Sequence, residues 1–257
     1  MNEDHRNTAS RAPSRALETL GFVAVTALAF GPALGWLRAL PAIVAFYLFA
    51  LGGILGTLAS LWILVRAVRG RVLGLGAAGG LLSGIVFLWT AFSSPRGPVI
   101  NDFSTDLDDP PEFVEAARAT ANLARDMKYD QTLAPVQQAC CGDLAPIEMP
   151  GLPAALAFER VQAVASSMPG WTVVATDAPA GRLEAVAETP LFGFRDDVVV
   201  RIRPEGAGSR VDMRSKSRDG RGDLGANAAR IRAFRERLLA AAIVQLGRGH
   251  SGDTSGH

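Results

Sequence analysis

The sequence has only three histidines, and all of them lie in its polar ends. His5, His250 and His257 fall in terminal stretches without hydrophobic periodicity, for which we expect disorder. A Ser-His-Asp triad, a histidine general base and most catalytic zinc sites need an imidazole held in a packed region. Any catalysis would therefore use carboxylates, Ser, Lys, Tyr or Cys, and we expect neither a cofactor nor a bound metal.

Cysteine is also scarce. Cys140 and Cys141 are adjacent, and a bond between neighbours would close a strained ring outside normal disulfide geometry. We interpret them as two thiols or as pairing with other molecules. A redox role is the alternative, although the C-x-x-C spacing of a dithiol is missing.

The chain lacks an excess of either charge. It has 26 Lys and Arg against 25 Asp and Glu, whereas binding of nucleic acid requires a concentrated basic face. The whole-chain charge therefore gives no electrostatic case for nucleic acid, so we expect none as a partner.

Three long stretches have no Asp, Glu, Lys, Arg or His, and they predict transmembrane helices. They cover residues 20–37, 40–65 and 72–92, each close to or above the roughly 17 to 25 apolar residues that span a bilayer. The first contains Gly31-Pro32, so an interfacial segment or retained signal anchor is its alternative. An ion or proton pathway would need an ionisable residue at membrane depth, so the spans do not indicate a transporter.

The arginines around the spans predict their orientation. Six lie before the first span or between the second and third: Arg6, Arg11, Arg15, Arg66, Arg69 and Arg71. Only Arg38 and Arg96 flank the other side. Because positively charged flanks stay cytoplasmic, we expect a cytoplasmic tail at residues 1–19 and a multi-pass protein of the inner (cytoplasmic) membrane, with its C-terminal domain in the periplasm.

Small residues recur at every fourth position in the second and third spans. The glycines of these stripes are Gly52, Gly56, Gly76, Gly80 and Gly84. Such stripes let helix backbones approach closely. They pack the second span on the third within one chain or, alternatively, form the face of a homodimer.

The residues after the spans predict a small α+β domain. We expect a Pro- and Asp-rich linker at 93–109, an exported domain at 110–248 and a disordered tail at 249–257. Helices are predicted at 110–125 and 153–168. From Gly170 the hydrophobic period changes to two, which predicts a four-stranded antiparallel sheet with strands at 171–177, 182–189, 197–204 and 209–217.

The last two strands alternate between apolar and charged residues. Val198, Val200 and Ile202 share a face with Val211 and Met213, which predicts a core face and leaves the charged face wet. Leu183, Ala185 and Ala187 extend the core face. The charged face holds Arg182, Glu184, Glu188, Arg201, Arg203, Arg210, Asp212, Arg214 and Lys216. Such charges often only solubilise a sheet, but their basic excess favours a patch for an anionic lipid, a glycan or an envelope protein.

The segment before the last predicted helix is rich in cations and glycines. Asp223 is the expected cap of that helix, whose buried face we assign to Leu224, Ala228, Ile231, Leu238 and Ala242. Backbone amides and cations at a helix N-terminus favour an anion; a purely structural loop and cap is the alternative. A phosphate-binding G-x-x-x-x-G-K-[ST] motif is missing. The candidate ligand-binding residues are Arg201, Arg203, Arg214, Lys216, Arg218, Arg221 and Asp223.

Several motifs of the expected domain resemble the family called domain of unknown function 1499. They are NDFSTD at 101–106 followed by DDPP, MPGW at 168–171, GRLEA at 181–185, FGFRDDVVVRIRP at 192–204 and GSRVDMRSKSRDGRGDLGANAARIRAF at 208–234. The chain departs from the family at CCGDLAP, residues 140–146, where a Tyr-Pro typically precedes the Asp. The resemblance implies a small α/β module, often with membrane spans attached, and no assigned reaction, cofactor or catalytic residue.

These observations favour a non-catalytic, membrane-anchored envelope protein whose exported domain binds an anionic ligand or a partner protein. One alternative is a carboxylate-dependent hydrolase using Asp196, Asp197, Asp219 or Asp223, which would need two of them in one cleft. Another is a structural spacer or assembly subunit whose spans associate with other membrane proteins.

Overall fold

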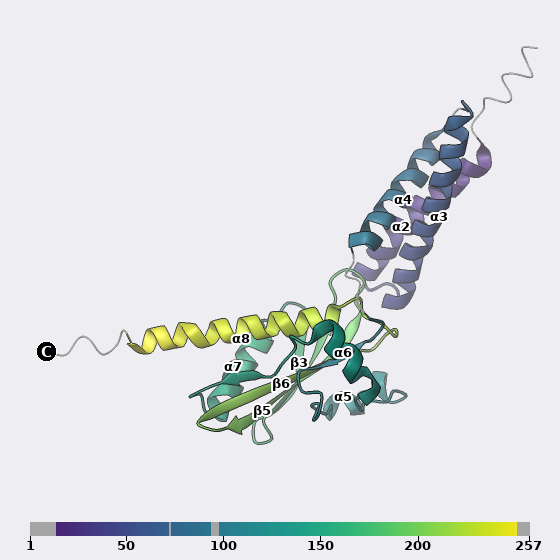
Figure 1. Cartoon of the computed structure of the whole chain (residues 1–257). Coiled ribbons are helices and arrows are strands. Elements are labelled where there is room, and N and C mark those ends of the chain that lie inside the picture. The colour runs from purple at the N-terminus through teal and green to yellow at the C-terminus, as the bar shows by residue number, and fades with distance from the viewer. Residues whose placement is uncertain (1–13, 72, 94–97, 251–257) are drawn as a thin grey trace, which may run out of the picture. The chain divides into compact units, whose positions relative to one another are not determined.

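The structure is a computed structural model that describes residues 14–71, 73–93 and 98–250, with side chains described up to residue 241. It divides into two compact units (Figure 1). The first comprises Met1–Ser94 with Pro190–Gly193, and the second comprises Pro95–Thr189 with Phe194–His257.

The first unit contains three helices that are long and apolar enough to cross a membrane, as expected. They are α2 (Arg15–Trp36), α3 (Ala42–Val68) and α4 (Leu75–Ser93). Helix α2 continues through Pro32 and begins before the predicted span, so it includes Glu18. Glu18 Oε2 accepts a hydrogen bond from Gly76 N at 2.6 Å, in the first turn of α4. A carboxylate there satisfies a free N–H group and opposes the positive end of the helix dipole.

The glycines of the two stripes contact other helices of the same chain. A Cβ at Gly52 would lie 2.3 Å from Leu28 N of α2, and one at Gly56 would lie 2.4 Å from Ser83 Cβ of α4. The three stripe glycines of α4 meet α2 or α3 at similarly short range: Gly76, Gly80 and Gly84. Packing within one chain therefore accounts for the stripes, and a homodimer stays a prediction.

The second unit is an α+β domain built on a six-stranded antiparallel sheet, rather than the four strands expected. The predicted meander is β3 (Trp171–Asp177), β4 (Arg182–Glu188), β5 (Arg195–Glu205) and β6 (Gly208–Ser217). The additional strands, β1 (Asp102–Ser104) and β2 (Ile147–Met149), both pair with β6. Three residues are too few to show a period of two, and β1 lies inside the segment expected as a linker.

The helices of this domain differ from the prediction in its first third. Residues 110–125 form only the short helix α5 (Glu115–Arg118) and the single turn η1 (Thr120–Asn122). Turn η2 (Gln131–Leu133) and α6 (Ala134–Cys141) follow. Helix α7 (Ala154–Ser167) matches the second predicted helix.

The last helix, α8 (Ala226–His250), extends two residues into the expected tail. Its first turn is capped as expected, because Asp223 Oδ2 accepts from Asn227 N at 2.7 Å. Ala228, Ile231 and Leu238 are buried as predicted, whereas Leu224 precedes the helix and is 62% exposed. The side chain of Ala242 lies outside the described residues.

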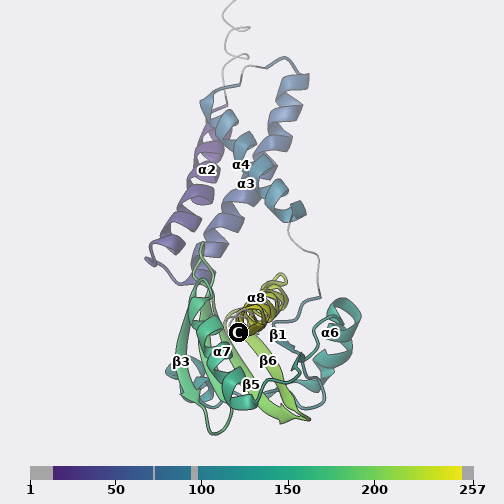
Figure 2. The same ribbon diagram turned by 90° about the vertical axis from the view of Figure 1, so that its left-hand side faces the viewer.

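Helices α7 and α8 cover one face of the sheet, and this layer is the hydrophobic core (Figure 2). The apolar residues predicted for the core face are all buried: Leu183, Ala185, Ala187, Val198, Val200, Ile202, Val211 and Met213. Phe234 of α8 stacks on Trp171 of β3 with ring centroids 5.6 Å apart. The alternation in the strands therefore identified the core face correctly.

One outer edge of the sheet is formed by β3 and the other by β1 and β2, which both pair with β6, and the edges at β3 and β1 are modified. Strand β3 has an irregularity between Val173 and Ala175, where its register with β4 shifts. At the other edge, Ser104 N donates to Gln137 Oε1 at 3.0 Å, and Gln137 Nε2 donates to Ser104 O at 2.6 Å. The Gln137 amide thus occupies the hydrogen-bonding groups of Ser104.

Candidate functional site

The charged face of the sheet is partly covered, although the sequence predicted a wet surface: Glu184, Asp212 and Arg214 are buried, and its other charged residues are half-buried. Residues 105–129, which we call the cover segment, bind across it. Glu184 Oε1 accepts from the backbone of Val114 at 2.8 Å, and its Oε2 accepts from Ala116 N at 2.8 Å. Glu184 and Asp212 are 0% exposed. Glu184 thus accepts from the N–H groups at the start of α5, which have no partner within the helix.

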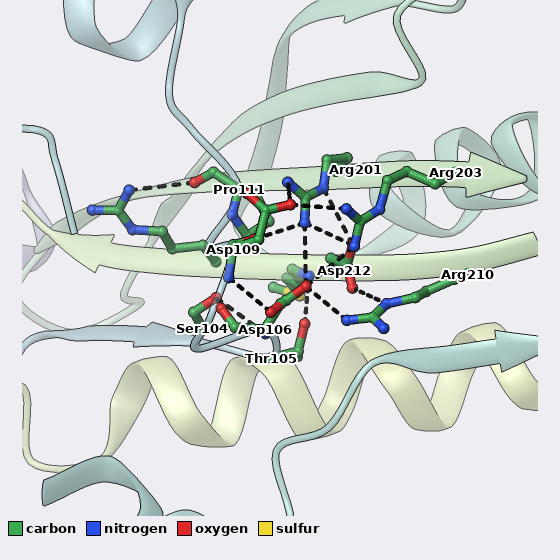
Figure 3. A network of polar contacts seen from close by, with 11 residues as sticks. Ser104, Thr105, Asp106, Asp109, Pro111, Arg201, Arg203, Arg210 and Asp212 are labelled. Atoms are coloured by element: carbon green, nitrogen blue, oxygen red, sulfur yellow. Dashed lines mark hydrogen bonds and ion pairs between the residues drawn. The ribbon is translucent and has the colours of Figure 1, made fainter. Parts of the chain in front are cut away.

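Three aspartates and three arginines form a network at one end of this face (Figure 3). They are Asp106, Asp109, Arg201, Arg203, Arg210 and Asp212. Arg210 Nη2 lies 2.7 Å from Asp106 Oδ2, and Arg201 Nη2 lies 2.9 Å from Asp212 Oδ2. Burial raises the pKa of Asp106, but the Asp109 N–H group and the three guanidinium groups outweigh it and lower that pKa below its ordinary value.

This network is balanced in charge, with as many carboxylates as cations in direct contact. Arg201 and Arg203, two of the candidate ligand-binding residues, therefore already have carboxylate partners. A bound anion would have to compete with those carboxylates.

Arg214, another candidate, is enclosed between the cover segment and the sheet and is 1% exposed. Its Nε donates to Asp102 Oδ1 at 2.9 Å and its Nη2 to Asp102 Oδ2 at 2.8 Å. The guanidinium also lies over two rings, 4.8 Å from the centroid of Phe113 and 5.3 Å from that of Tyr129. Bidentate pairing and aromatic stacking are the contacts that favour arginine over lysine.

Asp102 has a second cation. Lys216 Nζ donates to Asp102 Oδ2 at 2.8 Å, and Asp102 is itself opposite Lys216 in the pairing of β1 with β6. Arg214 and Lys216 of β6 therefore share a single buried carboxylate.

Asp197 of β5 lies next to this arrangement, because it is opposite Lys216 in the pairing of β5 with β6. Arg218 Nη2 donates to Asp197 Oδ1 at 2.7 Å. Asn122 Nδ2 donates to Asp197 Oδ2 at 2.9 Å, and Arg125 Nη1 lies 3.4 Å from the same oxygen. Asp197, like Asp102, thus has two cations.

We call Arg125, Arg214, Lys216 and Arg218, with Asp102 and Asp197, the cation cluster. Within direct ion-pair contact its four cations share two carboxylates, an excess of two positive charges. Lys216, Arg218 and Arg125 retain side-chain exposures of 13%, 15% and 20%. The cluster is therefore partly buried but open to solvent.

A cleft of about 680 Å³ lies against the cluster, lined mainly by the cover segment. Arg125 and Arg214 belong to its wall, together with Phe113, Lys128 and Tyr129. Burial raises the pKa of Tyr129 to about 12, and the nearby Asp102 charge adds to the shift. The phenol therefore stays protonated near neutral pH, and its hydroxyl donates to Gln137 Oε1 of α6 at 3.5 Å.

The remaining candidate residues do not join the cluster. Arg221 is exposed and makes no ion pair within the part of the chain that the structure describes. Asp223 is occupied as a helix cap, with its Oδ1 accepting from Gly225 N at 2.8 Å. Ser215 and Ser217 lie on the other face, where both bind Asn227 of α8.

Three of the four carboxylates of the hydrolase alternative are occupied by separate partners. Adjacent strand residues point to opposite faces, and Asp196 accordingly pairs with Arg230 of α8, whereas Asp197 lies under the cover segment. Asp223 caps α8, and Asp219 is half-buried in the preceding loop. Asp196 and Asp197 therefore do not face one cleft as a pair for acid/base catalysis. Among residues 14–71, 73–93 and 98–250, no cluster of three or more His, Cys, Asp or Glu is arranged to hold a metal.

The two cysteines lie at the end of α6, outside the cleft. Cys140 Sγ is 2.7 Å from Cys141 Sγ, and both thiols are free. Burial, followed by the neighbouring Cys141, raises the pKa of Cys140 to about 11. Cys140 is therefore a thiol rather than a reactive thiolate near neutral pH.

Sequence reasoning missed Asp102, Asn122, Arg125 and Tyr129. Asp102 was assigned to a linker, although Asp102, Ser104 and Asp106 recur at every second position, which is a weak strand signal. The other three lie in irregular backbone and have no periodic signal. Their roles follow only from the folding of the cover segment over the sheet.

Comparisons with known proteins match the same domain. A family model described as a protein of unknown function, DUF1499, matches residues 102–238, which is more than half of the 257 residues. No curated protein matches the chain. The crystal structure of TTHA0849 from Thermus thermophilus is similar at 16% identity over 38% of this chain and 96% of that chain, with a TM-score of 0.22.

Proposed function

Because the chain belongs to the DUF1499 family of proteins of unknown function and carries three apolar helices, we propose a membrane-anchored, non-catalytic protein whose α+β domain binds an anionic group at the cation cluster. The observation that supports the proposal is the excess of cations over carboxylates in a partly buried site. Charges there are screened less by salt than charges at the surface, so an added anion is favoured.

The proposal changes which residues are expected to bind. Arg201 and Arg203 belong to the balanced network, and Arg214 is held by Asp102. The cations of the cluster that are partly exposed, and that we expect to contact the anion, are Lys216, Arg218 and Arg125. Arg214 contributes its charge from beneath them and keeps Asp102 in place.

We also propose that the helices lie in an inner membrane with the domain in the periplasm. The support is the arginine asymmetry, with Arg66, Arg69 and Arg71 joining the second and third spans. A reporter that is active only outside the cytoplasm, fused after Leu246, should be active. A C-terminal tag that protease cannot reach in intact spheroplasts, but cuts after lysis, would refute this placement.

Anion binding is tested on the full-length protein in detergent, with inorganic phosphate as the probe. Phosphate that binds only the folded state at ten times its Kd adds about 1.4 kcal/mol to the unfolding free energy. We expect this stabilisation in the native protein and its loss in the double variant Lys216→Gln, Arg218→Gln, which leaves as many cations as carboxylates. The control Arg195→Gln removes an exposed cation from β5 outside the cluster and should behave as the native protein does.

Two results would contradict the proposal. One is the absence of any stabilisation by phosphate, and the other is equal stabilisation of the native protein and the double variant. If residues 1–96 alone restored the phenotype of a deletion strain, the structural spacer would replace ligand binding as the function.

A further inference from the structure

The cleft beside the cation cluster combines features that narrow the class of ligand. Arg125 and Arg214 belong to both the cluster and the cleft wall. Lys128, which is exposed and makes no ion pair within the described residues, lines the same cleft. An acidic group bound between Arg125 and Lys128 would leave the rest of the ligand inside the cleft.

The cleft also contains negatively charged side chains. Asp108 and Glu112 line it, are exposed, and have no cation partner in the described part of the chain. Ionised carboxylates can only accept hydrogen bonds, so they favour a ligand that offers donors such as hydroxyl groups. The same carboxylates would repel a flat anionic membrane surface, because exposed like charges within about 10 Å repel at moderate salt.

The cleft has an apolar part as well. Leu123 is 70% exposed, and it lines the cleft with Met127 and the ring of Tyr129. Apolar and aromatic groups of this kind pack against the C–H faces of a ring. A bare inorganic anion would leave all of these groups unused.

We propose that the ligand is an acidic saccharide, a sugar that carries a phosphate or carboxylate group. The acidic group binds Arg125 and Lys128, the hydroxyl groups donate to Asp108 and Glu112, and the sugar ring lies on Leu123 and Tyr129. This inference rests on the proposed function and adds the class of ligand to it. A cleft of about 680 Å³ falls within the range of about 300 to 1,000 Å³ typical of small-molecule sites.

The test compares affinities by calorimetry on the full-length protein in phosphatidylcholine nanodiscs. The probes are inorganic phosphate, glucose 6-phosphate, glucuronate and glucose. We expect glucose 6-phosphate to bind at least about tenfold more tightly than phosphate, since each 1.4 kcal/mol of added contacts gives a factor of ten. Glucuronate should bind more tightly than glucose, because only glucuronate has the acidic group.

A double variant isolates the contribution of the hydroxyl contacts. In Asp108→Asn, Glu112→Gln the advantage of glucose 6-phosphate over phosphate should fall from about tenfold to below about threefold, because neutral amides are weaker acceptors than carboxylates. Phosphate itself should bind no more weakly than before. The control Glu159→Gln, at an exposed position of α7, should keep the full advantage.

The outcomes separate this inference from the proposed function. If phosphate binds but glucose 6-phosphate has no advantage, or keeps it in the double variant, the saccharide is refuted while the anion site stands. If neither ligand binds, both proposals fail. If adding phosphatidylglycerol to the discs abolishes the binding of glucose 6-phosphate, a lipid headgroup is the occupant and the saccharide is again refuted.

Discussion

One face of the sheet is covered by α7 and α8 and the other by the cover segment, and the two covers are held in different ways. On the helical side, buried apolar residues such as Val200, Met213 and Leu238 form one continuous cluster. On the other side, Arg214 and Asp197 are as deeply buried as these core residues, but each is held by charged and polar partners. Adjacent residues of the same strands therefore contribute to two unlike layers.

The difference shows what each layer requires. An apolar face is satisfied by any well-packed apolar neighbour, because the hydrophobic effect has no direction. A buried charge needs a specific partner at hydrogen-bonding distance, and without one the cost of desolvation remains. The cover segment can therefore be irregular in backbone while its contact residues are tightly specified.

The largest effect should follow from removing Asp102. The variant Asp102→Asn leaves the buried guanidinium of Arg214 and the Lys216 ammonium without their carboxylate, and we expect it to lower the unfolding free energy by about 4 kcal/mol. Hydrogen exchange measured by mass spectrometry on peptides of β5 and β6 reports this change in the full-length protein. The double variant Asp102→Leu, Arg214→Met should recover part of the loss, since apolar residues can replace the buried Asp102–Arg214 pair, while Lys216 stays without its carboxylate. If Asp102→Asn lowered the unfolding free energy by less than about 1 kcal/mol, the charged layer under the cover segment would not depend on specific ion pairs as described.

On the helical side, Leu183→Ala should cost about 3 kcal/mol through lost burial and the cavity left behind. Leu183 is fully buried and belongs to the apolar cluster of the core. The same exchange measurement should therefore give a loss that does not change with salt concentration. A loss that halves in high salt would indicate that the helical layer also depends on charge.

Asp106→Asn should have a smaller effect, about 2 kcal/mol, because three arginines keep their other carboxylates. The folded-state pKa of Asp106 lies below its ordinary value of 3.8. Its contribution to stability is therefore present above about pH 4 and is lost as the pH falls through the lowered pKa. Between pH 7 and pH 3 the native protein should lose more stability than the variant; equal losses would place the acid sensitivity elsewhere.

The smallest effect is expected at the surface. Arg195 Nε lies 3.0 Å from Glu188 Oε2, with side-chain exposures of 57% and 27%. Arg195→Gln should change the unfolding free energy by less than about 0.5 kcal/mol, because exposed pairs are screened and flexible. A change above about 1 kcal/mol would show that the location of a pair, buried or exposed, does not decide its contribution.

The same contrast explains how far the sequence predicted the fold. The core face could be read from Val198, Val200 and Ile202, because burial on one side of a strand imposes a period of two. That period also grouped Arg201, Arg203 and Arg214 correctly, but it cannot tell whether a charged face meets water or a second layer. The answer depends on Asp102, Asn122 and Arg125, whose segments form pairs with residues about 70 to 110 positions away.

The candidate site was therefore predicted in part. Lys216, Arg214 and Arg218 were named from the sequence and lie in the cation cluster. Arg125 was not named, because no periodic pattern relates η1 and its flanking loop to the strands. The excess of positive charge could be located only after Asp102 and Asp197 had been assigned to their partners.

The side-chain amide of Gln137 has a consequence for association between chains. An open strand edge offers N–H and C=O groups on which a further strand from another molecule can add, which is the first step of fibril growth. At β1 these groups of Ser104 are already bound by one glutamine. Addition of a strand at Ser104 would thus require α6 to detach first, so a single side-chain amide blocks intermolecular β-pairing at this residue.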